Sequence, residues 1–178
     1  MLPSPTPRLR FREMTDDDLD EMTAVLGAPD PARPTRRRRT RADAERWIAW
    51  NIRNYAEHGF GLWVIETHDG ELVGDCGLTI QDVEGEPFVE VGYHVKLELR
   101  SQGLATEAAA AVRDAARDAG IPCLVAIIRP ENTPSQRVAQ KIGLTLQRTA
   151  FKGGGDVLVF GAELAADEFP PDGWSGTP

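Results

Sequence analysis

The segment between residues 89 and 119 constrains the fold more than any other part of the chain. An apolar, strand-like run, Val89–Val95, leads into a glycine-containing turn, Arg100–Gly103, and an alanine-rich helix that begins near Leu104. The first N–H groups of a helix lack partners within the helix, and the helix dipole attracts negative charge to the same place. Gly103 and Ala105 let a ligand approach the backbone, and Arg100 adds a positive charge. The segment therefore predicts a site for phosphate groups.

The turn does not match two well-known phosphate-binding motifs. A Walker loop ends in Gly-Lys-Ser/Thr, whereas Ala105 and Thr106 follow the glycine here. A dinucleotide fingerprint requires three glycines at fixed offsets, and only Gly103 is present. From these residues alone, an ordinary strand-to-helix turn without a ligand is the alternative.

The pattern Arg100-x-x-Gly103-x-Ala105 resembles the acyl-coenzyme A pyrophosphate loop of the GNAT N-acetyltransferase superfamily. Further motifs resemble the RimJ/RimL-type branch of that superfamily and occur in the same order along the chain. They are Arg8–Arg12 with Asp16–Leu19, Phe60–Val64, Val73–Leu78, Glu90–Val95, Arg129–Val138 and Lys141–Leu144. The match is collinear from about Arg8 to about Glu163, which makes it far more specific than any single motif.

The resemblance implies one N-acetyltransferase domain, residues 8–165, with flexible tails at residues 1–7 and 166–178. The expected fold class is α/β (α+β), a mixed and mostly antiparallel sheet of about seven strands flanked by about four helices. In that fold the fourth and fifth strands, here Phe88–Val95 and Leu124–Ile128, splay apart and the pantetheine arm of the donor inserts between them. Gly92 is expected to form the β-bulge that opens this gap, and a packing glycine is the alternative.

Hydrophobic periodicity and turn residues predict the other elements. Helices are expected at Thr15–Leu26, Arg41–Glu57, Leu104–Ala119 and Ser135–Ile142. Strands are expected at Leu62–Thr67, Glu71–Thr79, Leu146–Phe151 and Val157–Leu164. An antiparallel meander therefore comes first, and one strand–helix–strand unit follows it.

The resemblance also assigns the donor, acetyl-coenzyme A, to particular residues. Its pyrophosphate is expected at Arg100, Ser101, Gln102, Gly103, Leu104, Ala105 and Thr106. Backbone N–H groups near Tyr93 or Val95 are expected to polarise the thioester carbonyl. Asn132 is expected to bond the pantetheine, and Ser135 is expected near the sulfur as a donor or proton relay. A helix N-cap is the alternative role for Ser135, and both roles can coexist.

Acetyl transfer to an amine requires the amine to be neutral, so a group that accepts its proton is useful. Glu90 is the first candidate base, because burial beside the splay raises the pKa of a carboxyl group. The alternative for Glu90 is a surface or cross-strand ion pair. His94 is the second candidate, because strand alternation places it on the same face as Glu90.

The chain departs from the family pattern at three places. Many superfamily members use a tyrosine after the second cofactor helix as the acid for the thiolate, but residues 138–144 contain none, so this role falls on Ser135 or on no residue. Arg100 and Ser101 stand where the branch often has an aromatic residue and a glycine. A glutamate that some relatives use as a base in the fifth strand is replaced by Ile127 or Ile128.

Composition argues against several other classes. The net charge of −8 and the pI near 4.9 argue against general nucleic-acid binding. No apolar run approaches the roughly 20 residues that cross a bilayer, and Met1–Pro5 does not resemble a signal peptide. Cys76 and Cys123 lack the spacing of a metal site and are expected as buried thiols in a reducing cytoplasm.

We therefore predict a cytoplasmic, metal-independent N-acetyltransferase that moves an acetyl group from acetyl-coenzyme A to a primary amine by direct attack in a ternary complex. The resemblance favours a protein N-terminal α-amine, with ribosomal proteins as the named class. The alternatives are a small amine (polyamine, amino acid or aminoglycoside), a non-catalytic acyl-coenzyme A module, and an interaction domain with a vestigial groove. Arg36–Arg39 is either a solvated loop or a clamp for an acidic acceptor or ribosomal RNA. A monomer and a homodimer are both open.

Overall fold

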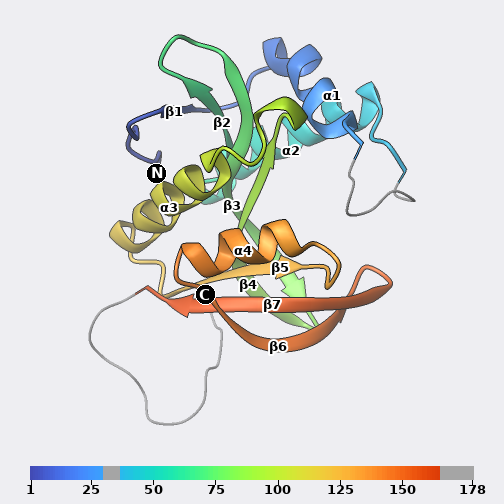
Figure 1. Ribbon diagram of the computed structural model, residues 1–178, viewed down its shortest axis with the longest axis vertical. Helices are drawn as coiled ribbons and strands as arrows, with labels where there is room; N and C mark the ends of the chain where they lie inside the picture. Colours follow the sequence, from blue (N-terminus) through green and yellow to red (C-terminus); the bar gives the residue numbers. More distant parts are fainter. Residues whose placement is uncertain (30–36, 165–178) are drawn as a thin grey trace.

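The computed structural model describes residues 1–29 and 37–164 and contains one seven-stranded sheet in the order β1-β2-β3-β4-β5-β7-β6 (Figure 1). The strands are β1 (Leu9–Arg12), β2 (Leu62–Thr67), β3 (Leu72–Val83), β4 (Glu86–Val95), β5 (Cys123–Ile128), β6 (Thr145–Lys152) and β7 (Gly155–Glu163). The α-helices in the described ranges are α1 (Leu19–Gly27), α2 (Arg41–His58), α3 (Leu104–Asp118) and α4 (Thr133–Lys141). The predicted fold class is confirmed.

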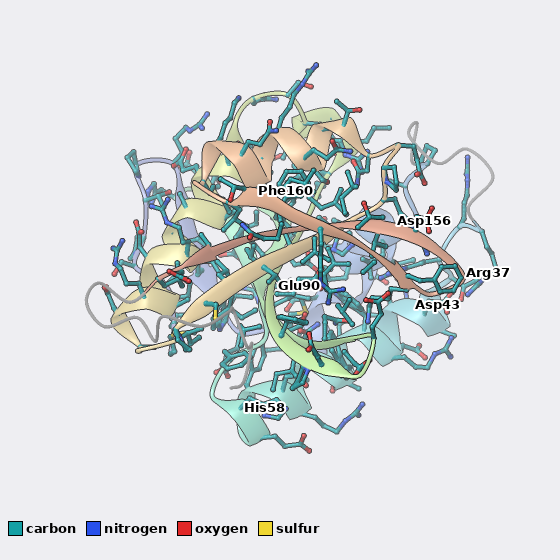
Figure 2. The ribbon with its side chains drawn as sticks, turned by 90° about the horizontal axis from the view of Figure 1, so that it is seen from below. Arg37, Asp43, His58, Glu90, Asp156 and Phe160 are labelled. Carbon is teal, nitrogen blue, oxygen red and sulfur yellow. The ribbon has the colours of Figure 1, made fainter. Side chains whose placement is uncertain are left out.

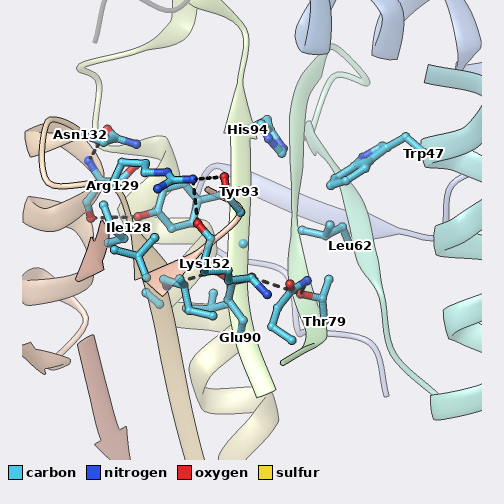
Figure 3. A pocket seen from close by; sticks show the side chains of 18 of the residues that line it. Trp47, Leu62, Thr79, Glu90, Tyr93, His94, Ile128, Arg129, Asn132 and Lys152 are labelled. Carbon is cyan, nitrogen blue, oxygen red and sulfur yellow. Dashed lines mark hydrogen bonds between the residues drawn. The ribbon is translucent and has the colours of Figure 1, made fainter. Parts of the chain in front are cut away.

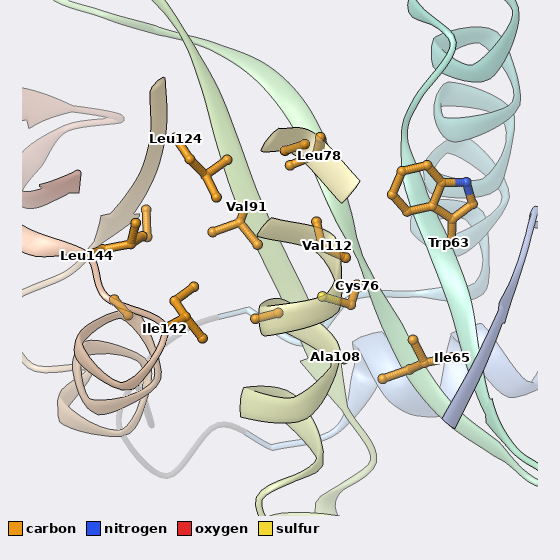
Figure 4. Packing of buried hydrophobic residues seen from close by; sticks show 14 of the residues in the cluster. Trp63, Ile65, Cys76, Leu78, Val91, Ala108, Val112, Leu124, Ile142 and Leu144 are labelled. Carbon is orange, nitrogen blue, oxygen red and sulfur yellow. The ribbon is translucent and has the colours of Figure 1, made fainter. Parts of the chain in front are cut away.

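The helices cover both faces of the sheet (Figure 1). The larger core cluster joins α3 and α4 to one face, and small residues on α3, among them Ala108 and Val112, bring this helix close to Val91 and Leu124 (Figure 4). A second cluster joins α1 and α2 to the other face, around Ile48 and Leu62. The helices therefore cover both faces of the central strands, whereas the edge strand β6 is largely exposed.

The hairpin of β3 and β4 is longer than predicted. Pairing continues to Val83 opposite Glu86, whereas we expected a break between Thr79 and Phe88. The two residues of the turn, Glu84 and Gly85, both have positive φ, 57° and 89°. This is the geometry of a tight type I′ hairpin turn, and it lies within the break expected at residues 84–87, so the position of the turn was predicted and the strand ends were not.

The first predicted helix is also divided. Thr15 caps a short 3-10 turn, Asp16–Asp18, and α1 follows it. Asp18 is held by Arg12 at 2.6 Å and accepts a hydrogen bond from the backbone N–H of Thr15 at 2.8 Å. The carboxylate therefore fixes the chain at the start of the helix rather than lying free in its first turn.

The splay between β4 and β5 is present without the β-bulge predicted at Gly92. Residues of β3 and β4 pair one for one from Val83–Glu86 to Gly74–Val95, so the expectation of a bulge is wrong. In the described residues the parallel ladder between β4 and β5 consists of a single pair, Glu90 opposite Val125. The gap therefore opens because pairing stops after one position, not because an extra residue bends β4.

Several smaller expectations have mixed outcomes. Cys76 is buried as predicted, whereas Cys123 is partly exposed. Met1 and Thr6, in the segment expected to be loose, bond Gly59 and Glu107, and the mobility of residues 1–7 stays a prediction. Residues 166–178, the other expected tail, lie outside the described residues. Among the described helices, none combines the length and apolar character needed to cross a bilayer.

Candidate active site

A pocket of about 440 Å³ lies where β4 and β5 diverge (Figure 3). Its walls come from β3, β4, β5, α2, the start of α4 and the β6–β7 hairpin. The pocket brings together five of the residues predicted from the sequence. These are Glu90, Tyr93, His94, Asn132 and Ser135. The other predicted residues, Val95 at the end of β4 and Arg100–Thr106 after it, lie outside this pocket lining.

Glu90 lies at the closed end of the splay. Its two carboxylate oxygens accept hydrogen bonds from the backbone N–H of Ile127 at 3.1 Å and from the Thr79 hydroxyl at 3.5 Å. Burial raises the pKa of Glu90 to about 7, and the hydrogen bond from Ile127 and the charge of Lys152 only partly oppose this shift. Near neutral pH the carboxyl group can therefore both accept and release a proton.

His94 points into the same pocket and is held by a buried aspartate that we did not predict as a site residue. Asp75 Oδ1 lies 2.8 Å from His94 Nδ1 and accepts a hydrogen bond from the His94 backbone N–H at 3.0 Å. The other oxygen, Oδ2, accepts a hydrogen bond from Trp47 Nε1 at 2.8 Å. The Trp47 ring meets the His94 ring edge-on, with centroids 5.4 Å apart. Carboxylate, indole and imidazole thus form one cluster, of which Figure 3 shows the Trp47 and His94 side chains.

Local packing places the members of this cluster within reach of one another. Asn51, fully buried on α2, accepts a hydrogen bond from the Leu62 N–H at 2.8 Å and donates one to the Trp47 carbonyl at 3.0 Å. Asn51, one helical turn after Trp47, therefore links the backbone of Trp47 to Leu62 at the start of β2. On β3, a Cβ at Gly74 would lie 2.0 Å from the His94 carbonyl oxygen, so only glycine permits the close approach of β3 and β4 beside Asp75.

Gly92 forms the floor between the two candidate bases. It lies on the same face of β4 as Glu90 and His94 and lines the pocket. A Cβ added there would meet Leu62 Cδ2 at 3.3 Å. The missing side chain therefore leaves room for a ligand directly between Glu90 and His94.

The backbone of β4 exposes hydrogen-bonding groups to the gap. Lys96 N–H donates to the Val73 carbonyl at 2.9 Å, so this pair is hydrogen-bonded across the β3–β4 ladder. Because bonding alternates along an antiparallel strand, the backbone groups of Tyr93 and Val95 point away from β3 and toward β5. Consistent with this, Arg100 Nε reaches the Val95 carbonyl from that side, at 3.0 Å.

The start of α4 differs from the sequence prediction. The helix begins at Thr133, and Asn132 is its N-cap, with Oδ1 accepting a hydrogen bond from the Ser135 N–H at 3.3 Å. The alternative role of Ser135 as the cap is therefore wrong. The Ser135 carbonyl accepts a hydrogen bond from the Tyr93 hydroxyl at 3.0 Å, which ties α4 to β4 across the splay. Burial raises the pKa of this hydroxyl, so Tyr93 stays protonated.

The predicted phosphate turn leads directly into α3 through two residues with positive φ. Gly103 is the N-cap of α3 with φ 82°, and Ser101 also has a positive φ of 62°. Ser101 stands where related chains often have glycine, and it takes a glycine-like conformation at that position. Leu104 is buried, so it offers a ligand its backbone only. The N–H groups of the first turn of α3, which have no partner within the helix, come directly after Gly103 in the chain.

An N-terminal arginine braces this turn. Arg8 donates through Nε to Glu107 at 2.6 Å and through Nη1 to the Gln102 carbonyl at 3.0 Å. The charge of Arg8 is thus held beside the first turn of α3. No motif in the sequence indicates this role for Arg8.

The arginine run before α2 is described only in part. Arg36 lies outside the described residues. Arg37 pairs with Asp43 at 2.9 Å, and Figure 2 shows the two side by side. The Arg39 guanidinium lies 4.7 Å from the Trp47 ring centroid and lines the pocket. One arginine of the run therefore borders the site.

Two basic residues on the far side of the pocket were also missed. Arg129 donates to the carbonyls of Asp156, Lys152 and Gly153, at 3.1, 2.9 and 2.9 Å. Lys152 lines the pocket, and its positive charge lowers the pKa of Glu90, which partly opposes the effect of burial. Arg129 opens the Arg129–Val138 motif but was not given a role of its own, and Lys152 comes from the β6–β7 hairpin, which carries no recognisable motif. Within residues 1–29 and 37–164, no group of three or more His, Cys, Asp or Glu is placed to hold a metal ion.

Comparison with known proteins identifies the family of this site. The model of the acetyltransferase (GNAT) domain matches residues 8–145. The uncharacterized protein YkkB of Bacillus subtilis is 32% identical over 158 residues, which cover 87% of this chain and 92% of YkkB. The chain therefore belongs to the GNAT acetyltransferase family, and it is an N-acetyltransferase that depends on acetyl-coenzyme A.

Solved structures share the fold over nearly the whole chain. An acetyltransferase from Agrobacterium tumefaciens is 25% identical, with a TM-score of 0.75 over 91% of this chain and 94% of that one. RimL, the ribosomal L7/L12 α-N-protein acetyltransferase solved with coenzyme A, is 17% identical, with a TM-score of 0.74 over 94% of this chain and 100% of that one. At this low identity, the second likeness shows the fold alone.

Proposed function

We propose that this enzyme acetylates the N-terminal α-amine of a protein, as the RimJ/RimL-type branch does, inside the cytoplasm. The observation that carries the proposal is the pocket at the splay. Backbone groups of Tyr93 and Val95 face its gap, and Glu90, with a pKa near 7, closes its end. A thioester and an amine can therefore meet beside a group that is ready to exchange protons.

The donor enters from the turn that follows β4. Its pyrophosphate binds the N–H groups at the start of α3, and Arg100 and Arg8 stand beside the turn. The pantetheine lies between β4 and β5, bonded to the backbone of Tyr93 and Val95, with Asn132 and Ser135 along its other side. These N–H groups polarise the thioester carbonyl as the amine attacks.

The acceptor lies over Gly92 and attacks directly in a ternary complex. The tetrahedral intermediate expels the thiolate of coenzyme A, and the hydroxyl of Ser135, which lines the pocket, relays to that thiolate the proton that Glu90 takes from the nitrogen. Glu90 takes a proton from the nitrogen as the amide forms. No covalent enzyme intermediate is required, because the thioester is already activated.

A second hollow of about 410 Å³ favours an extended acceptor. It is lined by Arg39, Asp43, Arg46, Trp47, Trp50 and Gln81, and four of these residues also line the pocket. The two hollows therefore join along α2, past the side chains of Trp47 and Trp50. A peptide chain can leave the reacting amine along this path, which a small amine does not need. RimL, with the same fold, is named for a protein N-terminus.

Release of free thiol from acetyl-coenzyme A tests the proposal when the acceptor is varied. The acceptors are a serine-initiated hexapeptide, the same peptide with a blocked N-terminus and an added lysine, and spermidine. We expect thiol release and a mono-acetylated product with the first peptide only. Acetylation of spermidine alone would move the acceptor to the small amines. Donor binding without any acetylated product would favour a binding module.

A further inference from the structure

Asp75 is a buried carboxylate whose neighbours explain what it does. Its exposed fraction is 0%, and both oxygens are bonded, Oδ1 to His94 and Oδ2 to Trp47. Asp75 lies directly opposite His94 in the β3–β4 register. A fully buried acid inside an apolar strand is costly unless it is fully hydrogen-bonded, so a simple packing role would be served better by an apolar residue.

The contact fixes how the imidazole presents itself to the pocket. A carboxylate only accepts hydrogen bonds. Nδ1 of His94 therefore carries a hydrogen and donates it in a hydrogen bond to Asp75 Oδ1. In the neutral ring, Nε2 is then the proton acceptor. The His94 side chain is 31% exposed and lines the pocket, which makes Nε2 available to a ligand there. The Trp47 ring against the imidazole holds its plane.

We propose that Asp75 is a positioning residue that holds His94 as the first proton acceptor for the incoming amine. The inference rests on the proposed function, because it assigns a step to the same pocket. An ammonium group must lose two protons to become an amide. His94 takes the first before attack, and its imidazolium passes it to solvent. The second leaves the nitrogen after attack, goes to Glu90, and reaches the expelled thiolate of coenzyme A.

The spacing along β4 allows His94 and Glu90 to accept the two protons at different positions in the pocket. Glu90 and His94 are four residues apart on one strand, which separates their Cα atoms by about 13 Å. Gly92 lies between them without a side chain. His94 is at the end of the pocket that faces α2, where an acceptor enters, and Glu90 is at the closed end (Figure 3). His94 can therefore accept a proton from the nitrogen before attack, and Glu90 can accept one after it.

The charges around His94 come from three other elements as well as from its own strand. Asp75 faces it from β3, and Arg39 lies over Trp47 before α2. Lys96, on the same face of β4, pairs with Glu21 of α1 at 2.7 Å. Asp75 is the carboxylate in direct contact with the ring, and its other oxygen bonds Trp47, so a His94 variant is needed to separate the two contacts.

The test is the pH dependence of kcat/KM for Asp75→Asn, with the serine-initiated hexapeptide, or spermidine if that is the acceptor. At pH 7 we expect a loss of about 10- to 100-fold. The deficit should shrink above pH 8, because an α-amine then loses its proton unaided. Affinity for acetyl-coenzyme A should not change. Asp69→Asn, the same substitution on the exposed β2–β3 hairpin, is the matched control and should leave all rates unchanged.

A double-substitution cycle separates positioning from a structural role. In a His94→Gln background, Asp75→Asn should cost less than about threefold, because the residue through which it acts is gone. Equal losses in both backgrounds, or a deficit that stays constant with pH, would overturn the inference. If Asp75→Asn does not fold, His94→Gln alone decides: kcat/KM within twofold of wild type at pH 7 contradicts it. A wild-type enzyme that acetylates neither probe would instead count against the proposed function.

Discussion

The donor turn and the acceptor pocket are close together along the chain, since the pocket lies beside residues 90–94 of β4 and the turn follows the end of that strand, but they are built in different ways. The turn, Arg100–Gly103, continues directly into α3, and its binding groups are backbone N–H groups. The pocket is assembled from side chains of α2, β3, β4, β5, α4 and the β6–β7 hairpin. One site is thus local in sequence and made of main chain, and the other is distant in sequence and made of side chains.

The difference explains what each site is suited to do. Every donor presents the same phosphates, so a fixed main-chain cradle is sufficient for it. The acceptor pocket has to shift the pKa of Glu90 by burial and hold His94 through Asp75, and both effects need residues from several elements. Changes in the turn should therefore affect the donor alone, and changes in the pocket should affect the acceptor and the rate.

Gly103→Trp should have the largest effect on donor binding, because it places a bulky side chain on the N-cap of α3 at φ 82°. Loss of two hydrogen bonds to charged phosphate corresponds to about 100-fold weaker binding of acetyl-coenzyme A or more. Calorimetric titration measures it. Gly120→Trp, at the other end of α3 with φ 77° and open space, is the matched control. Normal donor affinity in the Gly103 variant would place the phosphates elsewhere.

Glu90→Gln should lower kcat by about 10²- to 10⁴-fold while leaving donor affinity unchanged. The wild-type rate should rise with pH through about 7, because only the ionised carboxyl accepts a proton, and the variant should lack this rise. Rates measured from pH 5.5 to 9 test both points. An unchanged pH profile would assign the role to His94 or water.

The same substitution should stabilise the protein at alkaline pH. Burial raises the pKa of Glu90 from 4.5 to about 7, so the folded state binds this proton more tightly than the unfolded state. The stabilisation is fully present below 4.5 and is lost as pH rises through about 7. At pH 8 we expect Glu90→Gln to be more stable than wild type by about 1–3 kcal/mol. Urea unfolding at pH 4.5 and pH 8 should show the gain at pH 8 only.

Gly92→Ala tests the floor of the acceptor pocket. The added methyl group would meet Leu62 Cδ2 at 3.3 Å and occupy the space between Glu90 and His94. One methyl group in a binding pocket is worth about 10-fold or more in kcat/KM, so we expect a loss of that size for the acceptor with an unchanged donor Kd. A loss of donor affinity instead would show that the two sites are not separate.

Ser101→Gly should have the smallest effect and concerns stability. Ser101 has φ 62°, and a residue with a Cβ in this conformation costs about 1–2 kcal/mol. We expect glycine to raise the free energy of unfolding by about 1 kcal/mol, a shift of roughly 2–4 °C in Tm. Ser101→Ala keeps the Cβ and should give no gain. Equal melting temperatures for all three chains would show that the turn is unstrained.

The sequence predicts the donor turn well because all of its information is local. The strand, Gly103 and the alanine-rich helix follow one another, and the fold class follows from the ordered motifs around them. The predictions that were wrong concern backbone conformations that no residue type in the sequence indicates. Glu84 adopts positive φ in the hairpin turn, and Asn132 rather than Ser135 caps α4. The gap beside Gly92 needs no bulge, because pairing with β5 simply stops.

The acceptor pocket could be predicted only in part, because contacts across the sheet decide it. Glu90 and His94 were found from their strand, but their partners come from elsewhere. Trp47 reaches Asp75 only after α2 packs on β2, and Lys152 reaches the pocket from the β6–β7 hairpin. One signal was available: Asp75 interrupts an otherwise apolar strand, and a buried acid requires partners.

The most direct test is a thermal melt with and without acetyl-coenzyme A for wild type, Gly103→Trp and Gly92→Ala. At about 100 times Kd the donor stabilises a fold by roughly 2.7 kcal/mol, which raises Tm by roughly 5–10 °C for a chain of this size. We predict this rise for wild type and Gly92→Ala and its absence for Gly103→Trp. A rise that survives in Gly103→Trp, or one that disappears in Gly92→Ala, would contradict the separation of the phosphate turn after β4 from the acceptor position over Gly92.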